Sequence, residues 1–231
     1  MAIGDYIAYY KFDEELKDET LNYPLILSSS NNTKVEDRNG YLGAYTTNNS
    51  FYYNNTIRDN LTLLGNATVS FGVKIPSTYS LYDRLLYIGK PAAVSSCRML
   101  TLNGGSLMYN TWGHGYILCS LSGYLDKWIY VTFIYENGGS DVKLYIDNVL
   151  IKKLTGISTN SVTDFSLFIG GDSYKSVNAN MCFDEVRIYD RSLTIGEIDE
   201  LYDVVGSPTV TSPSYNYDGF PTWKWDTQVV L

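Results

Sequence analysis

Two groups of carboxylates in the chain are close enough in sequence to suggest acid–base chemistry: Asp184-Glu185, and Glu197, Asp199 and Glu200. A retaining glycosidase needs two carboxyl groups about 5 Å apart on one surface. Neighbouring residues on a strand point to opposite faces, and residues two apart on a helix do not share a face. We therefore expect both groups to have structural roles, and the chain not to be an enzyme.

The segment 109–116, YNTWGHGY, carries a different kind of chemistry. Aromatic rings stack on the apolar faces of sugars, and loops that carry such rings are common recognition elements. The glycines around His114 predict a loop here, and Tyr174 lies in another turn-like segment, as do Tyr79 and Tyr82. The predicted ligand-binding residues are Tyr109, Trp112, His114 and Tyr174. The alternative, that these rings pack against neighbouring loops or a partner chain, stays open.

Most of the chain consists of strands that would hold these residues in place. Alternating or continuous apolar runs predict strands at residues 7–12, 41–45, 50–53, 67–75, 84–88, 99–102, 106–110, 128–135, 142–146, 165–169 and 181–189. Asn103-Gly104-Gly105 and Asp147-Asn148 predict tight turns, and the glycines at 138–139 turn the chain. Because βαβ units are absent, we expect an all-β sandwich of two antiparallel sheets, a jelly roll.

A single short helix is predicted near the end of this run of strands. Thr194 stands at the N-cap position with Glu197 three residues later, which is a capping box. Leu193 and Ile198 occupy the hydrophobic-staple positions. Ile195, Ile198, Leu201 and Tyr202 are expected to form its apolar side.

Composition limits the classes of partner. The formal net charge of -8 argues against nucleic acid or an anionic membrane as the main partner, and no apolar run is long enough to span a bilayer. The N-terminus lacks a basic region followed by an apolar run, so we expect no signal peptide. Three cysteines without metal-site spacing predict reduced thiols and not a disulfide framework.

The composition changes after residue 205. We expect one domain over residues 1–205, then a Pro/Ser/Thr linker and an aromatic tail over 206–231. The tail carries Trp223 and Trp225 among other rings, and it either packs back on the sandwich or docks on another chain.

Several segments in order resemble the laminin-G-like, concanavalin-A-like jelly rolls, including their pentraxin relatives. They are YYKFDEELKDET, GYLGAYTTNNSFYY, ATVSFGVKI, DKWIYVTFIYENG, DVKLYIDNVLIKK, FSLFIGGD and FDEVRIYDRSLTIGEIDELY, which span roughly residues 7–202. The resemblance implies two stacked antiparallel sheets, one concave face and loops along its rim. It does not fix a function, because this family includes sugar binders, adhesion modules and accessory domains of enzymes.

The resemblance also implies a place for calcium. In the pentraxin relatives a late loop and an early loop supply the ligands, and these positions correspond here to Asp172 and to Asn48 and Asn49. Calcium takes six to eight oxygens, usually with several carboxylates. One aspartate with neutral amides beside Lys175 makes a weak site, so we expect no obligatory cofactor, and a plain surface loop is the alternative.

The leading hypothesis is a non-catalytic recognition or adhesion module that binds a glycan or a protein through rim loops. Without an export signal, such a module is expected to be released on lysis as a phage or virus particle component, or otherwise to stay in the cytoplasm. The competing hypotheses are a glycoside hydrolase or lyase on the same sandwich, with carboxylates on the concave face, and a purely structural assembly protein.

Overall fold

Strict alternation of apolar and polar residues defines the centre of the molecule. In β6 (Ala67–Lys74), Val69, Phe71 and Val73 are buried in the main core, and the residues between them point to the other face of the strand. β6 is hydrogen-bonded along both edges, to β11 (Trp128–Glu136) and to β15 (Cys182–Tyr189). β6 is therefore a central strand of its sheet, and so is β11, which pairs with both β6 and β12 (Asp141–Ile146).

The structure is a computed structural model of the 231-residue chain. It describes residues 4–12, 18–27, 33–37, 42–46, 52–54, 65–89, 97–111, 113–159, 166–171, 180–203, 214–215 and 221–222. Every structural statement below concerns these residues.

An eight-stranded sheet forms the first layer, with the order β13-β12-β11-β6-β15-β4-β3 and with β1 also paired to β15. Its other strands are β1 (Ala8–Tyr10), β3 (Thr33–Glu36), β4 (Leu42–Thr46), β12 (Asp141–Ile146) and β13 (Val149–Leu154).

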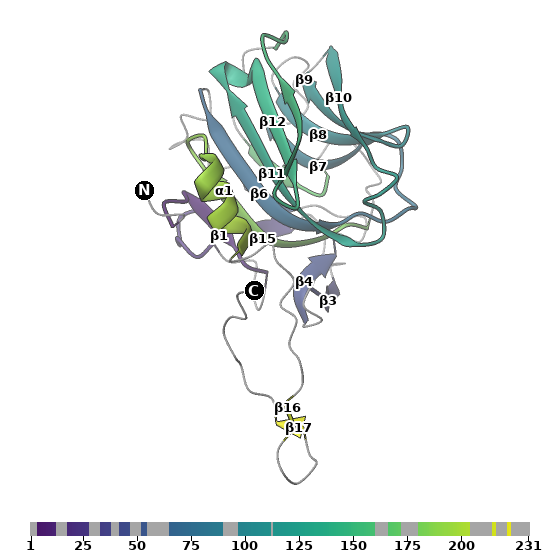
Figure 1. Cartoon of the computed structure of the whole chain (residues 1–231), viewed down its shortest axis with the longest axis vertical. Helices are drawn as coiled ribbons and strands as arrows, with labels where there is room; N and C mark the ends of the chain where they lie inside the picture. The colour runs from purple at the N-terminus through teal and green to yellow at the C-terminus, as the bar shows by residue number, and fades with distance from the viewer. Residues whose placement is uncertain are drawn as a thin grey trace.

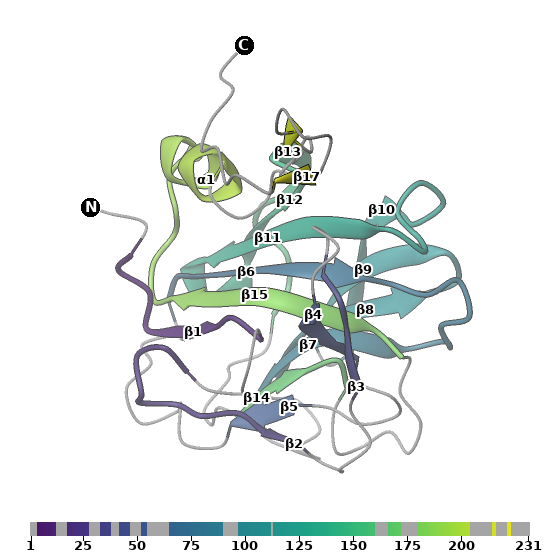
Figure 2. The ribbon, with the colours of Figure 1, turned by 90° about the horizontal axis from the view of Figure 1, so that it is seen from below.

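A seven-stranded sheet forms the second layer, with the order β10-β9-β8-β7-β14-β5-β2. Its strands are β2 (Ile26–Leu27), β5 (Tyr52–Asn54), β7 (Asp83–Gly89), β8 (Cys97–Asn103), β9 (Ser106–Thr111), β10 (His114–Ser120) and β14 (Ser166–Ile169). All strand pairings described in both sheets are antiparallel. The sheets lie face to face (Figures 1 and 2), and the inward residues of both form one continuous core. The predicted all-β sandwich is confirmed.

The predicted tight turns are also confirmed. Asp147 and Asn148 both have positive φ, 48° and 63°, between the paired residues Ile146 and Val149. Gly104 and Gly105 have φ of 56° and 83° between β8 and β9. The second turn fixes the register of β8 against β9, and this register places the residues of the site described below.

The helix α1 (Ile195–Leu201) lies on the outer face of the eight-stranded sheet (Figures 1 and 2), where it packs on residues of β11, β12 and β15. Its capping box is present: the Thr194 backbone N–H donates to Glu197 Oε2 at 2.8 Å, and the Glu197 N–H donates to Thr194 Oγ1 at 3.3 Å. Leu193, Ile198 and Leu201 are buried against Tyr130 and Tyr189 of the sheet, among others. Ile195 is 68% exposed, so its predicted place on the apolar side is wrong.

Four strands of the two sheets lie outside the predicted ranges: β2, β3, β10 and β13, of which β13 directly follows the predicted turn at Asp147-Asn148. β2 and β3 are short, and their sequences lack a clear alternation. β10 matters more, because the glycines around His114 predicted a loop there. Tyr109 belongs to β9, the strand predicted at 106–110, whereas His114 opens β10 opposite Thr111.

The structure also describes the three cysteines. Cys97 is buried, Cys119 and Cys182 are half-buried, and all three thiols are free. In the part of the tail that the structure describes, β16 (Ser214–Tyr215) pairs with β17 (Pro221–Thr222). The one helix among the described residues is too short to cross a bilayer.

The capping box should contribute measurably to stability. We expect Thr194→Ala to lower the free energy of unfolding by about 1 kcal/mol, because one helix N–H loses its acceptor. Thr194→Ser keeps the hydroxyl and should stay close to wild type. Urea unfolding of the three proteins checks this, and equal loss in both variants would contradict it.

The contribution of Glu197 should depend on pH. The hydrogen bond from the Thr194 backbone N–H holds the pKa of this carboxyl below its ordinary value of 4.5, with help from the Thr194 hydroxyl and Arg191. A lowered folded-state pKa means that the ionised group stabilises the fold above pH 4.5, and that this stabilisation is lost as the pH falls through the folded pKa. The stability difference between wild type and Glu197→Ala should therefore shrink on acidification, and a constant difference would contradict this assignment.

Candidate functional site

The outer face of the seven-stranded sheet carries two rows of side chains that run across the strands. In the first row, Met99 of β8 lies opposite Asn110 of β9, which lies opposite Gly115 of β10. In the second row, Arg84 of β7 lies opposite Thr101, followed by Met108 and Ile117. These residues alternate with core residues such as Leu100 and Tyr109, so sheet packing forces them outward.

Aromatic residues continue the first row toward the other edge of the sheet. Tyr87, Phe168 and Tyr53 follow Met99 on β7, β14 and β5. Phe168 lies 5.4 Å from Tyr87 in an edge-on arrangement and 6.0 Å from Tyr53 in a stacked one, measured between ring centroids. Tyr87, Met99 and Phe168 are buried, so this half of the face forms a packed wall beside the open half.

A hollow of about 310 Å³ lies on the open half. This volume is at the lower end of the range of roughly 300–1,000 Å³ that small-molecule sites occupy. The hollow is lined by Tyr82, Arg84, Met99, Thr101, Asn110, Thr111, Gly113, His114 and Gly115.

Gly115 shapes the floor of the hollow. A Cβ at this position would lie 2.7 Å from Asn110 Oδ1 and 3.0 Å from Met108 Cε, so both side chains lie over the bare backbone. The Asn110 side-chain amide donates to the Thr101 hydroxyl. The amide oxygen of Asn110 is therefore held above Gly115, where it can accept a hydrogen bond.

Tyr82 presents an aromatic ring at the rim. Its φ of 65° is in the left-handed region, which is costly for a residue with a side chain. Its backbone N–H donates to the Leu102 carbonyl at 2.7 Å and helps to hold this conformation. The side chain is 58% exposed although it is a large apolar one. Strained residues of this kind cluster at binding sites.

Arg84 lies at the base of the hollow. Its side chain is buried, its Nε donates to Met99 Sδ at 3.3 Å, and its guanidinium carbon lies 5.9 Å from the centroid of the Tyr87 ring. The methionine and the tyrosine hold the stem along the sheet. A guanidinium can only donate hydrogen bonds, so a ligand group that meets it must be an acceptor.

Of the residues predicted to bind a ligand, the structure places His114 in this hollow, where it is exposed. Tyr82, which the sequence placed in a turn, joins it. Trp112 and Tyr174 lie outside the described residues, as do Asp172 and Asn49 of the predicted calcium site. Among the residues that are described, no group of three or more His, Cys, Asp or Glu side chains could hold a metal ion. Calcium binding stays a prediction.

Tyr109 is a correction. Its ring is fully buried between the sheets, 5.4 Å from the Phe133 ring, and its hydroxyl donates to the Gly139 carbonyl at 3.2 Å. Arg98 donates to the neighbouring Gly138 carbonyl, so the two side chains hold the Asn137–Gly139 turn. Burial raises the pKa of Tyr109. The side chain points into the core because Tyr109 alternates with the outward Asn110, and it does not reach a ligand at the surface.

Two of the suspected carboxylates, Glu185 and Glu197, have structural partners. Glu185 accepts from the Tyr9 hydroxyl at 2.7 Å and pairs with Arg187 at 2.7 Å, and the Arg187 guanidinium stacks on Tyr9 at 3.8 Å. Glu197 is used in the helix cap.

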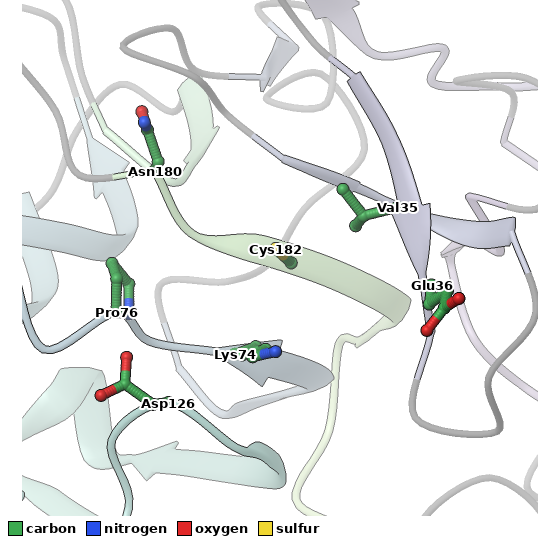
Figure 3. A pocket seen from close by; sticks show the side chains of 7 residues that line it. All are labelled: Val35, Glu36, Lys74, Pro76, Asp126, Asn180 and Cys182. Carbon is green, nitrogen blue, oxygen red and sulfur yellow. The ribbon is translucent and has the colours of Figure 1, made fainter.

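A second hollow, of about 360 Å³, opens at the ends of β3, β6 and β15 in the other sheet (Figure 3). It is lined by Val35, Glu36, Lys74, Pro76, Asp126, Asn180 and Cys182. Figure 3 shows Glu36 and Asp126 on opposite sides of it. The Ser77 backbone N–H donates to Asp126 at 2.9 Å and lowers the pKa of this carboxyl. A general acid requires a raised pKa, and none of the described residues that line this hollow is aromatic, so we take the first hollow as the candidate site.

Sequence reasoning missed Arg84, Thr101, Asn110 and Gly115. A usable signal was present in the predicted turn at Asn103–Gly105. A two-residue hairpin turn at Gly104-Gly105 makes Asn103 pair with Ser106, and counting back from this pair sets Thr101 and Met99 opposite Met108 and Asn110. The unrecognised strand β10 then supplies Gly115.

Comparison with known families gives one match. A family model described as "Concanavalin A-like lectin/glucanases superfamily" matches residues 30–199, which is more than half of the chain. A search of curated protein sequences found no match.

Solved structures share the fold at low sequence identity. Domain 4 of AbnA, an extracellular arabinanase from Geobacillus stearothermophilus, in complex with arabinotriose, has a TM-score of 0.68 and 19% identity over 85% of this chain and 98% of that one. The botulinum neurotoxin serotype D ligand-binding domain with N-acetylneuraminic acid has a TM-score of 0.69 and 18% identity over 95% and 55%. The neurotoxin DC binding domain with rat synaptotagmin II has a TM-score of 0.69 and 14% identity over 96% and 56%. The chain spans about half the length of these toxin domains.

The buried position of Tyr109 leads to a prediction. Tyr109→Phe should lower the free energy of unfolding by about 1 kcal/mol, because the Gly139 carbonyl loses its donor. Binding of any ligand in the hollow should be unchanged. Chemical denaturation and a binding titration check both parts. A variant of wild-type stability that no longer binds would place Tyr109 in the site after all.

Proposed function

The chain belongs to the concanavalin A-like lectin/glucanase superfamily, and we propose that it is a non-catalytic recognition module that binds a saccharide in the hollow on its seven-stranded sheet. The observation that carries this proposal is the exposed Tyr82 ring beside a floor of ordered polar groups. A ring of this kind stacks on the apolar face of a pyranose, while amide and hydroxyl groups read its hydroxyls.

The polar groups of the hollow have fixed directions. Thr101 orients the Asn110 amide, Gly115 leaves room for it, and His114 lies at the rim. Oriented donors and acceptors do not have to be ordered when the ligand arrives, which lowers the entropic cost of binding. Specific binding of one sugar geometry is the expected consequence.

A non-catalytic role is supported by the residues on this face. Glycosidases of the retaining type need two carboxyl groups about 5 Å apart. The outward positions in the described parts of β7, β8, β9, β10 and β14 contain no Asp or Glu. The competing hypothesis, a glycoside hydrolase or lyase, would be supported by release of reducing ends from a bound oligosaccharide.

A protein ligand is the second candidate within the same class. One structural neighbour is a complex with synaptotagmin II, and others are complexes with arabinotriose and N-acetylneuraminic acid. The rings and polar groups around the small hollow favour the saccharide. Docking of residues 206–231 on another chain, association with a virus particle and a purely assembly role remain predictions from the sequence.

Filling the floor of the hollow should weaken binding. In Gly115→Val the new side chain displaces Asn110 and Met108, so we expect an affinity loss of at least about tenfold, or about 1.4 kcal/mol. Gly123→Val is the matched control, because nothing lies within 4 Å of its Cβ position. A glycan array with wild type identifies ligands, and isothermal titration calorimetry compares the three proteins.

Two results would count against the proposal. The first is that no glycan binds the folded wild-type protein. The second is that a bound glycan retains its affinity in Gly115→Val, which would place its site elsewhere.

Saccharide binding in the hollow should not depend on calcium. The described residues that line it supply a guanidinium, an imidazole, hydroxyls and amides but no carboxylate, and calcium sites usually contain several carboxylates. Affinity after treatment with EDTA should equal the affinity with added calcium. Loss of binding in EDTA would instead favour the site predicted at Asp172 and Asn49.

A further inference from the structure

The charge of the hollow differs from the charge of the molecule. The chain carries a formal net charge of -8. The only described residues in the lining that can carry charge are Arg84 and His114. An anionic ligand therefore meets the positive side chain of Arg84 here, although the chain as a whole is negatively charged.

Arg84 is placed to give this region specificity. Its guanidinium is largely removed from water, and Met99 and Tyr87 hold the side chain along the sheet. A charge interaction in such a partly desolvated place is screened less than one at the surface. A planar guanidinium also matches a carboxylate with two parallel hydrogen bonds, which a neutral hydroxyl cannot reproduce.

The neighbouring groups select the rest of the ligand. Thr101 lies directly opposite Arg84 on the next strand, and it orients the Asn110 amide toward Gly115. The sequence of groups across the floor is thus a cation, a hydroxyl and an amide oxygen acceptor, with the Tyr82 ring at the rim. A simple carboxylic acid would use only the first of these, and a neutral sugar would use only the others.

We infer that the hollow selects a saccharide bearing a carboxylate, with the carboxylate on Arg84, a hydroxyl on Asn110 and a sugar face on Tyr82. The inference rests on the proposed function and deepens it by naming the ligand class. Uronic acids and sialic acids share this chemistry, and the experiment below distinguishes them.

The test uses matched pairs of acidic and neutral ligands with the full chain. Trigalacturonic acid is compared with galactotriose, and sialyllactose with lactose, by isothermal titration calorimetry. In at least one of these two pairs, we expect wild type to bind the acidic member at least about tenfold more tightly than the neutral member. In Arg84→Gln the preference for the acidic member should be lost, so that the two members of the pair bind with equal affinity. Lys74→Gln removes the same charge from the second hollow and should keep the preference.

The salt dependence of wild type gives a readout that needs no variant, should Arg84→Gln unfold. Affinity for the acidic member should fall as sodium chloride is raised, while affinity for the neutral member should not.

The outcomes separate the inference from the proposed function. Equal affinities for acidic and neutral members, or a preference that persists in folded Arg84→Gln, would overturn the inference. If saccharide binding in either of these cases is still lost in Gly115→Val, the proposed function is retained and only the preference for acidic saccharides is rejected. If no saccharide binds, or if Gly115→Val binds as wild type does, both the proposed function and the inference fall.

Discussion

The dry layer of side chains between the two sheets is the constraint on which the other features depend. Strands have a side-chain period of two, so a residue placed inward commits its neighbours outward. Val69, Phe71 and Val73 on β6, facing Leu100 and Tyr109 of the other sheet's inner side, fix this choice for both layers. A slip of one residue in any central strand would exchange its core residues for polar ones. The outward residues are therefore positioned by the core although they do not belong to it.

This constraint also explains why the candidate site lies on the outer face of the seven-stranded sheet and not on that of the eight-stranded sheet. On the eight-stranded sheet, α1 packs on residues of β11, β12 and β15, and Tyr9, Glu185 and Arg187 form a polar network. On the seven-stranded sheet, aromatic side chains fill one half of the outer face, and the strands β8 to β10 leave a hollow in the other half. Glycine at position 115 keeps that hollow open, and a strained backbone at Tyr82 presents its ring there. The register of the strands thus sets which side chains form the candidate binding surface. Gly115 and the backbone conformation of Tyr82 then adjust its shape locally.

The sequence predicted the layers well because periodicity, turn residues and the capping box all act over a few residues. Asp147-Asn148, Thr194 and the alternation of β6 are local signals, and all three appear in the structure as expected. The site was predicted only in part. His114 and Tyr82 were selected for their residue types, whereas Arg84, Asn110 and Gly115 come together only through pairing across β7 to β10. Tyr109 was misplaced because its position in the predicted strand at 106–110, on the same face as the core residue Leu107, was not taken into account. Trp112, Tyr174, Asp172 and Asn49 lie outside the described residues, and their roles stay predictions.

The most direct test of the account follows the methionine methyl groups by NMR during titration with a bound saccharide. The chain has 4 methionines. Met99 lines the hollow, the Met108 methyl lies over Gly115, and Met181 is fully buried in the main core. If the saccharide occupies the hollow, the resonances of Met99 and Met108 should shift with ligand concentration while that of Met181 stays in place. Binding that is detected by calorimetry but leaves Met99 and Met108 unshifted would contradict the account.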